Sequence, residues 1–367
     1  MKKILYILLT ILITSCGSNN QSPINEDDFS RSQILSNAYD NIILPAYANF
    51  NSDLNEFNNK TDIFISNINE QNLNNVRKSW AKAYMSWQGV EMFNLKKAEE
   101  ITYARVTNSY PCIEELIDSK IIDSISEIGP FNATILGATG FPAIGYLIYG
   151  NDSSNTLANF TGFDSEKHIA YLNALVKNIV NNTNLVIDDW NTTRSNFVNS
   201  TSNTATSSLN VITNDFIYYF EKKVRTAKFG NPIDYFGTMQ IRPDQIESYY
   251  KPELCKHLAI EAMKSVKRFY EGEYYDGSNN GVGLKEYLID LNADNLVSSI
   301  ENQFNEIDNK LNLLEDDFIL ELNTYNKDRI EQVFLAMQSL VTTLKSDMMV
   351  SYFGITEDYA DNDGDGG

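Results

Sequence analysis

The sequence is poor in the residues that most often build metal and catalytic centres. Its 367 residues include only two histidines, His168 and His257, and three cysteines. There is no HExxH pair for a zinc peptidase. The sequence also lacks a Gly-rich phosphate loop, a dinucleotide-binding glycine pattern and a G-x-S-x-G elbow, which speaks against the common nucleotide-binding and α/β-hydrolase classes.

Positive charge is scarce as well. The chain has 29 Lys and Arg residues against 49 Asp and Glu residues, a formal net charge of −20. Such a chain is repelled by the phosphates of nucleic acids and by anionic lipid head groups. We therefore expect no nucleic-acid partner.

Long apolar runs are missing except at the start of the chain. Lys2 and Lys3 precede an apolar stretch over residues 4–13, and residues 13–16 read Ile-Thr-Ser-Cys, like a lipobox. The stretch is too short to span a bilayer, so it predicts a signal peptide over residues 1–15. We expect lipidation of Cys16 and a flexible tether over residues 16–28. Cys112 and Cys255 would then remain, either as a disulfide or as two free thiols.

Helical periodicity dominates the rest of the sequence, and no alternating strand pattern is visible. Apolar spacing predicts an all-α fold of antiparallel bundles. The expected helices cover residues 34–50 with a kink or an interruption at Pro45, 72–98, 165–190, 207–229, 252–269, 284–291, 295–314 and 328–350. The tripeptides at Gly140 and Gly230, each Gly-x-Pro, mark either two similar halves, 29–195 and 205–355, or two unrelated helix signals. Residues 356–367 form an acidic tail.

The stretch GFPAIGYLIYG, residues 140–150, predicts a short buried helix. Pro142 suits the first helical position because its missing N–H is not needed there. Gly150 can end the helix in a left-handed conformation, and Gly145 lets another helix or a ligand approach the backbone closely.

Several segments together resemble the imelysin-like, or M75 peptidase, family of bacterial envelope proteins. These segments are residues 80–87 with 91–93, 139–150, 228–237, 283–288 and the terminal 361–365. The resemblance implies two helical bundles with a cleft between them, an envelope location and a link to iron uptake. It also implies a G-x-H-x-x-E helix, on which His and Glu lie one turn apart and can share a metal ion.

The sequence departs from that motif at both ligand positions. Gly140 matches the motif glycine, but Pro142 and Gly145 stand where the family has His and Glu. Neither side chain has a ligand atom, and metal-dependent hydrolysis needs a held metal ion. The resemblance therefore gives Gly140, Pro142 and Gly145 as cleft positions and no catalytic residue.

Other residues in the matching segments are candidates for the cleft. Family position suggests Glu91 and Asp234, with Arg105 and Lys228 able to balance their charge; Trp87 and Tyr235 accompany them.

Candidate metal ligands are few. His257 and Glu261 are spaced to share one helical face, and Glu91 and Asp234 offer carboxylates. Residues 361–366 match the first half of an EF-hand loop, without its closing Glu. The carboxylates of that segment are Asp361, Asp363 and Asp365. Whether a metal ion is bound stays open.

The sequence thus predicts a lipoprotein of the outer membrane, facing the periplasm or the cell surface, that binds a ligand without cleaving it. The family link implies iron or haem acquisition, with other uptake proteins as partners. One alternative is a metallopeptidase with relocated ligands. Another is a glycan-binding or scaffold lipoprotein, because three tyrosine pairs could stack on sugars.

Overall fold

The computed structural model describes residues 30–129, 133–150 and 156–359, and this part of the chain is all-α. Its only β-type pairing is an isolated bridge between Glu273 and Asn280. The predicted fold class is confirmed. No helix in the described ranges is long and apolar enough to cross a bilayer. Cys16, Asp361, Asp363 and Asp365 lie outside the described residues.

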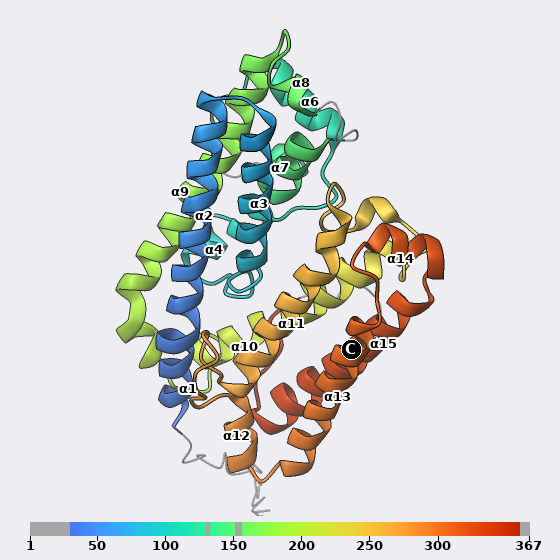
Figure 1. The fold of residues 1–367 in the computed structure, drawn as a ribbon. Coiled ribbons are helices and arrows are strands. Elements are labelled where there is room, and N and C mark those ends of the chain that lie inside the picture. Colours follow the sequence, from blue (N-terminus) through green and yellow to red (C-terminus); the bar gives the residue numbers. More distant parts are fainter. Residues whose placement is uncertain (1–29, 130–132, 151–155, 360–367) are drawn as a thin grey trace, which may run out of the picture.

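The first group of helices is built around α2 (Leu44–Ser66), which packs against both α3 (Glu70–Trp87) and α9 (Ser165–Val198) (Figure 1). The chain enters through α1 (Arg31–Asn37) and the π-helix η1 (Ala38–Ile43). Short helices fill the space between α3 and α9. They are α4 (Lys97–Glu100), α5 (Tyr103–Thr107), α6 (Glu114–Ile122), the 3₁₀ turn η2 (Ala133–Ile135), α7 (Gly140–Tyr149) and α8 (Thr156–Asn159).

The second group is built around α15 (Asp328–Thr342), which packs against α13 (Asp294–Asn312) and the π-helix η3 (Tyr219–Gly230). It also contains α10 (Ser208–Tyr218), α12 (Leu284–Asp290), α14 (Phe318–Tyr325) and the π-helix η7 (Thr343–Tyr352). Three 3₁₀ turns, η4 (Asn231–Ile233), η5 (Pro243–Gln245) and η6 (Pro252–Leu254), lead to α11 (Cys255–Glu271).

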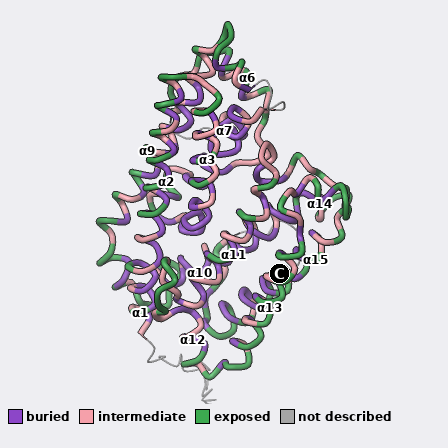
Figure 2. Tube along the Cα trace, viewed as in Figure 1, coloured by how far each residue is buried: buried purple, intermediate pink, exposed green. Residues whose placement is uncertain are grey.

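The two groups share one continuous core. Helix α11 contacts α3 as well as η3 and α13, and the buried apolar residues of both groups form one cluster. Figure 2 shows buried stretches in both groups. The halves expected from sequence therefore meet through apolar packing. The boundary expected near residues 195–205 stays a prediction.

The predicted helix over residues 72–98 is too long. Helix α3 ends at Trp87, and turns follow over residues 88–92. Gly89 is a poor helix former, and a Cβ there would lie 3.2 Å from both the Ser86 carbonyl and the Tyr275 ring. At Pro45 the chain stays helical, so an interruption there is wrong. The π-helix η1 changes to α2 directly before the proline, which accommodates its missing N–H. A kink at this position stays a prediction.

The segment 140–150 forms the expected buried helix, α7. Pro142 is the third residue of the helix rather than the first, still inside the turn whose N–H groups lack intrahelical partners. Gly150 ends the helix with φ +62°. Gly145 faces Trp80 of α3, where an added Cβ would lie 3.2 Å from the indole ring. The glycine therefore lets α7 pack closely on α3.

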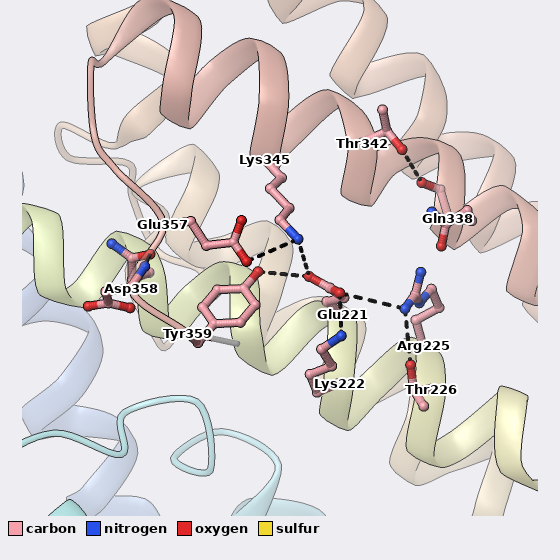
Figure 3. A network of polar contacts seen from close by, with 11 residues as sticks. Glu221, Lys222, Arg225, Thr226, Gln338, Thr342, Lys345, Glu357, Asp358 and Tyr359 are labelled. Atoms are coloured by element: carbon pink, nitrogen blue, oxygen red, sulfur yellow. Dashed lines mark hydrogen bonds and ion pairs between the residues drawn. The ribbon is translucent and has the colours of Figure 1, made fainter. Parts of the chain in front are cut away.

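A buried carboxylate fastens the end of the described chain to η3. Glu221 is fully buried and accepts a 2.7 Å hydrogen bond from the Tyr359 hydroxyl. Three cations, Lys222, Arg225 and Lys345, surround it, and Lys345 also pairs with Glu357 at 3.2 Å (Figure 3). Residues 356–359, the start of the expected acidic tail, are thus held against the second group of helices.

Candidate functional site

Five polar side chains meet in the interior where the two groups of helices join. Gln88 and Glu91 lie in the turns after α3, Asn108 follows α5, Lys228 lies near the end of η3, and Glu247 follows η5. Each is at most 5% exposed. We call these five residues the buried cluster.

Hydrogen bonds link the members of the buried cluster around Glu247. Lys228 donates to Gln88 Oε1 at 2.9 Å and forms an ion pair with Glu247 Oε2. Glu247 Oε1 accepts from Gln88 Nε2 at 3.1 Å and from Asn108 Nδ2 at 2.8 Å. The cluster therefore satisfies its buried charge pair with amide donors and acceptors, as low-dielectric surroundings require.

Glu91 completes the buried cluster but is only half satisfied. Its Oε1 accepts from Asn108 Nδ2 at 3.1 Å, whereas its buried Oε2 has no hydrogen-bond partner among the described residues. Burial raises the pKa of the Glu91 carboxyl, opposed by the Lys228 ammonium and reinforced by the Glu247 carboxylate. When protonated, Glu91 can donate a hydrogen bond as well as accept one.

A small pocket of about 100 Å³ reaches this carboxyl group. Besides Glu91 and Asn108, its wall carries two cationic side chains, Arg105 of α5 and Lys223 of η3. The remaining lining residues are Ser109, Tyr110 and Ala227. The pocket thus places two cations beside a buried carboxyl with a raised pKa, an arrangement suited to an anionic or hydrogen-bonding group of a ligand.

The structure brings together three of the candidate cleft residues. Glu91 and Arg105 line the same pocket, and Lys228 joins Glu91 through Glu247 and Asn108.

Trp87, Asp234 and Tyr235 have other surroundings. Trp87 packs inside the aromatic core, its ring centroid 5.0 Å from that of Tyr103. Asp234 accepts two 2.7 Å hydrogen bonds from Thr238, which hold its pKa below the ordinary value. Tyr235 packs on Phe334, with centroids 3.9 Å apart.

The three motif positions, Gly140, Pro142 and Gly145, are all buried in α7 and line neither this pocket nor the one described below. A Cβ on Gly140, where φ is +77°, would collide with the backbone of Thr107. Thr107 directly precedes Asn108. The motif glycine therefore supports the element that carries a member of the buried cluster.

The candidate metal ligands on α11 have other partners. His257 lies 3.5 Å from Asp316, and Glu261 pairs with Lys264, both near the surface. Within the described ranges, no three His, Cys, Asp or Glu side chains come together as a metal site. Cys112 and Cys255 are free thiols in the structure.

Comparisons with known proteins agree with this architecture. The family model Imelysin (Peptidase M75) matches residues 43–346. The fold is similar to a protein of Parabacteroides distasonis ATCC 8503 designated an iron-regulated protein A precursor, with 15% identity and a TM-score of 0.66, covering 85% of this chain and 92% of that one. It is also similar to an imelysin-like protein of Psychrobacter arcticum 273-4, with 13% identity and a TM-score of 0.70, covering 91% and 99%. At these identities the two structures show a shared fold. None of the curated proteins matches the chain significantly.

Proposed function

Because the chain belongs to the imelysin family, we propose that it is an envelope lipoprotein that binds a ligand without cleaving it and serves iron or haem acquisition. The name of the Parabacteroides distasonis neighbour, an iron-regulated precursor, supports the link to iron and to export. The ligand site is the pocket at Glu91.

One observation carries this proposal. The positions where the family motif has its metal ligands are Pro142 and Gly145, both buried in α7, whereas a pocket elsewhere reaches the half-satisfied carboxyl of Glu91. An unpaired buried polar atom costs about 1–3 kcal/mol, which a ligand bonded to it would recover. The site thus favours binding over hydrolysis.

The pocket also limits how a ligand is held. Its volume of about 100 Å³ is below the roughly 300–1,000 Å³ of pockets that enclose a drug-sized molecule. Only one group of a larger ligand fits beside Glu91. Arg105 and Lys223 favour a carboxylate, which ferric citrate and the propionates of haem both supply.

Peptidase assays test the non-catalytic half of the proposal. We expect the purified protein to leave casein and a peptide library intact with zinc present. Cleavage that a chelator abolishes would instead support the metallopeptidase with relocated ligands.

Titration with haemin and with ferric citrate tests the binding half. We expect one of these probes to bind, and the double substitution Arg105→Gln with Lys223→Gln to weaken binding about tenfold or more, since both carboxylate partners are lost. Lys78→Gln on the exposed side of α3 is the matched control. Absence of binding by both probes would contradict the proposal.

Lipidation is tested separately in cells. Labelling with a fatty-acid analogue should mark the wild-type chain and leave Cys16→Ser unmarked, and the wild type should fractionate with the outer membrane. If the wild-type chain is not labelled, the proposed lipid anchor at Cys16 is wrong.

A further inference from the structure

A second pocket, of about 320 Å³, lies between α2, α3 and α11. Its volume falls at the lower end of the range for small-molecule sites. Its lining residues are Asn49, Asp53, Lys82, Met85, Ser86, Gly89, Glu261, Ser265, Arg268 and Tyr275. None of them lines the pocket at Glu91.

Arg268 is the most unusual group in this pocket. Its side chain is only 15% exposed, yet within the described residues its guanidinium donates no hydrogen bond. Its only close partners are Glu273, at 4.0 Å, and the ring of Tyr275, whose centroid lies 4.9 Å from Cζ. An arginine in this state has its planar fork of donors available for a carboxylate.

The opposite charge is available in the same pocket. Asp53 is buried and pairs through Oδ1 with Lys82 at 3.0 Å, while Oδ2 receives only a long 3.4 Å contact from Asn49. Glu261 pairs through Oε1 with Lys264, so Oε2 can still accept hydrogen bonds. These oxygens suit an ammonium group.

Tyr275 lies among these charges. Its hydroxyl accepts a 3.1 Å hydrogen bond from Asn49, and its ring packs over Gly89, where a Cβ would come within 3.2 Å. Its backbone N–H donates to the Asn41 carbonyl at 2.8 Å. Both Asp53 and Glu261 oppose ionisation of this phenol, whose pKa burial raises, and Arg268 favours it. Tyr275 is therefore held in position at the side of the pocket, among charged side chains of both signs.

From this arrangement we propose that the pocket binds a small zwitterion of the α-amino acid class, with its carboxylate on Arg268 and its ammonium on the carboxylates of Asp53 and Glu261. Four charged side chains line the pocket, two of each sign, and their formal charges cancel. A multiply charged anion such as phosphate would meet two carboxylates there. A ligand with both signs avoids that repulsion.

Thermal-shift screening of the full chain with L-amino acids, followed by calorimetry, tests the proposal. We expect at least one amino acid to bind. Its amide, which lacks the carboxylate, and its N-acetyl form, which lacks the ammonium, should each bind about tenfold or more weakly. Acetate and inorganic phosphate at the same concentration should give no shift. Binding of the matching dipeptide in preference to the free amino acid would move the ligand class to short peptides and overturn the proposal as stated.

Substitutions locate the site. Arg268→Gln should weaken amino-acid binding about tenfold or more. Arg268→Lys should restore part of the affinity, because lysine supplies the positive charge without the planar guanidinium donors. Arg242→Gln, at an exposed arginine that lines neither pocket, is the matched control and should bind like the wild type. Equal binding by Arg268→Gln and the control, or no binding of any amino acid to the wild type, would overturn the proposal. Binding of haemin or ferric citrate at Glu91 is measured in a separate titration, so either of the two proposals can be wrong while the other holds.

Discussion

At the scale of single residues, Asp215 of α10 shows how burial sets a pH dependence. Its Oδ2 is buried without a hydrogen-bond partner among the described residues. Burial, with Glu99 and Asp358 adding repulsion, raises its pKa from 3.8 to about 7, against a hydrogen bond from the Asn94 backbone. Between these two values the unfolded chain has released the proton that the folded chain still holds. Folded stability from this group therefore falls as pH rises from about 4 to 7 and is then constant.

Asp215→Asn should remove this loss. We expect the free energy of unfolding of the variant, relative to wild type, to increase from pH 4 to 7 by at most about 4 kcal/mol, the equivalent of the full pKa shift. Urea unfolding across that pH range measures it. Asp347→Asn, an exposed position on η7, is the control. If the difference in unfolding free energy from wild type does not change with pH in either variant, Asp215 is not the source of the pH dependence.

The charge pair of the buried cluster gives a second residue-scale prediction. Lys228→Met leaves the Glu247 carboxylate buried without its cation, so we expect a loss of about 3–5 kcal/mol in unfolding free energy. Adding Glu247→Gln removes that uncompensated charge while keeping an oxygen for the amides of Gln88 and Asn108. The double variant should be more stable than Lys228→Met alone. Denaturant unfolding of all four members of the cycle checks this, and additive losses would contradict it.

At the scale of elements, sequence periodicity identified most of the helices but missed where function-related residues gather. Helices that bury one face carry their own spacing signal, as α9 and α13 do. Just after the end of α3 at Trp87, Gly89 packs under Tyr275, a residue nearly 190 positions away in sequence. Periodicity contains no information about such a contact, and it therefore predicts a helix that continues through Gln88.

The buried cluster shows the same limit. The family resemblance pointed to Glu91, and the need to balance its charge pointed to Arg105 and Lys228. Nothing in the sequence pointed to Gln88, Asn108 and Glu247, or to Lys223 in the pocket. Asn108 and Glu247 lie in loops, where polar residues are common and carry no burial signal. The π-helical turns of η3 were also invisible, because their apolar residues still repeat at roughly helical spacing; such turns occur often at functional sites.

Helix α7 leads to a prediction about the G-x-H-x-x-E motif that the family resemblance implies. Introducing it with Pro142→His and Gly145→Glu should not create a metal site, because position 145 faces the Trp80 ring inside the core. A buried, unpaired carboxylate there should lower the unfolding free energy by about 3 kcal/mol or more. Lys78→Glu on exposed α3 is the control. Native-like stability with stoichiometric zinc, measured by elemental analysis, would contradict this reading of α7.

At the scale of the whole molecule, the last described residues of the chain pack back against helices of the second group. Phe353 stacks on Tyr287 of α12 with centroids 4.5 Å apart. Asn214 of α10 donates to the Thr356 carbonyl at 3.1 Å. Tyr359 then reaches the buried Glu221 of η3. Residues 353–359 therefore bridge α12 and the consecutive elements α10 and η3, which are distant from α12 in sequence.

This packing predicts a local rather than global effect for Tyr359→Phe. The substitution removes one hydrogen bond to a buried carboxylate, worth about 1.5–3 kcal/mol, while Lys222, Arg225 and Lys345 still compensate Glu221. Hydrogen exchange followed by mass spectrometry should show faster exchange in residues 353–359 and unchanged exchange in α11. Tyr325→Phe, whose ring lies under Arg329 near the surface, is the matched control. Exchange that accelerates equally throughout the chain would mean that the segment is part of the global folding unit, and no acceleration would mean that the apolar contacts of Phe353 hold it without Glu221.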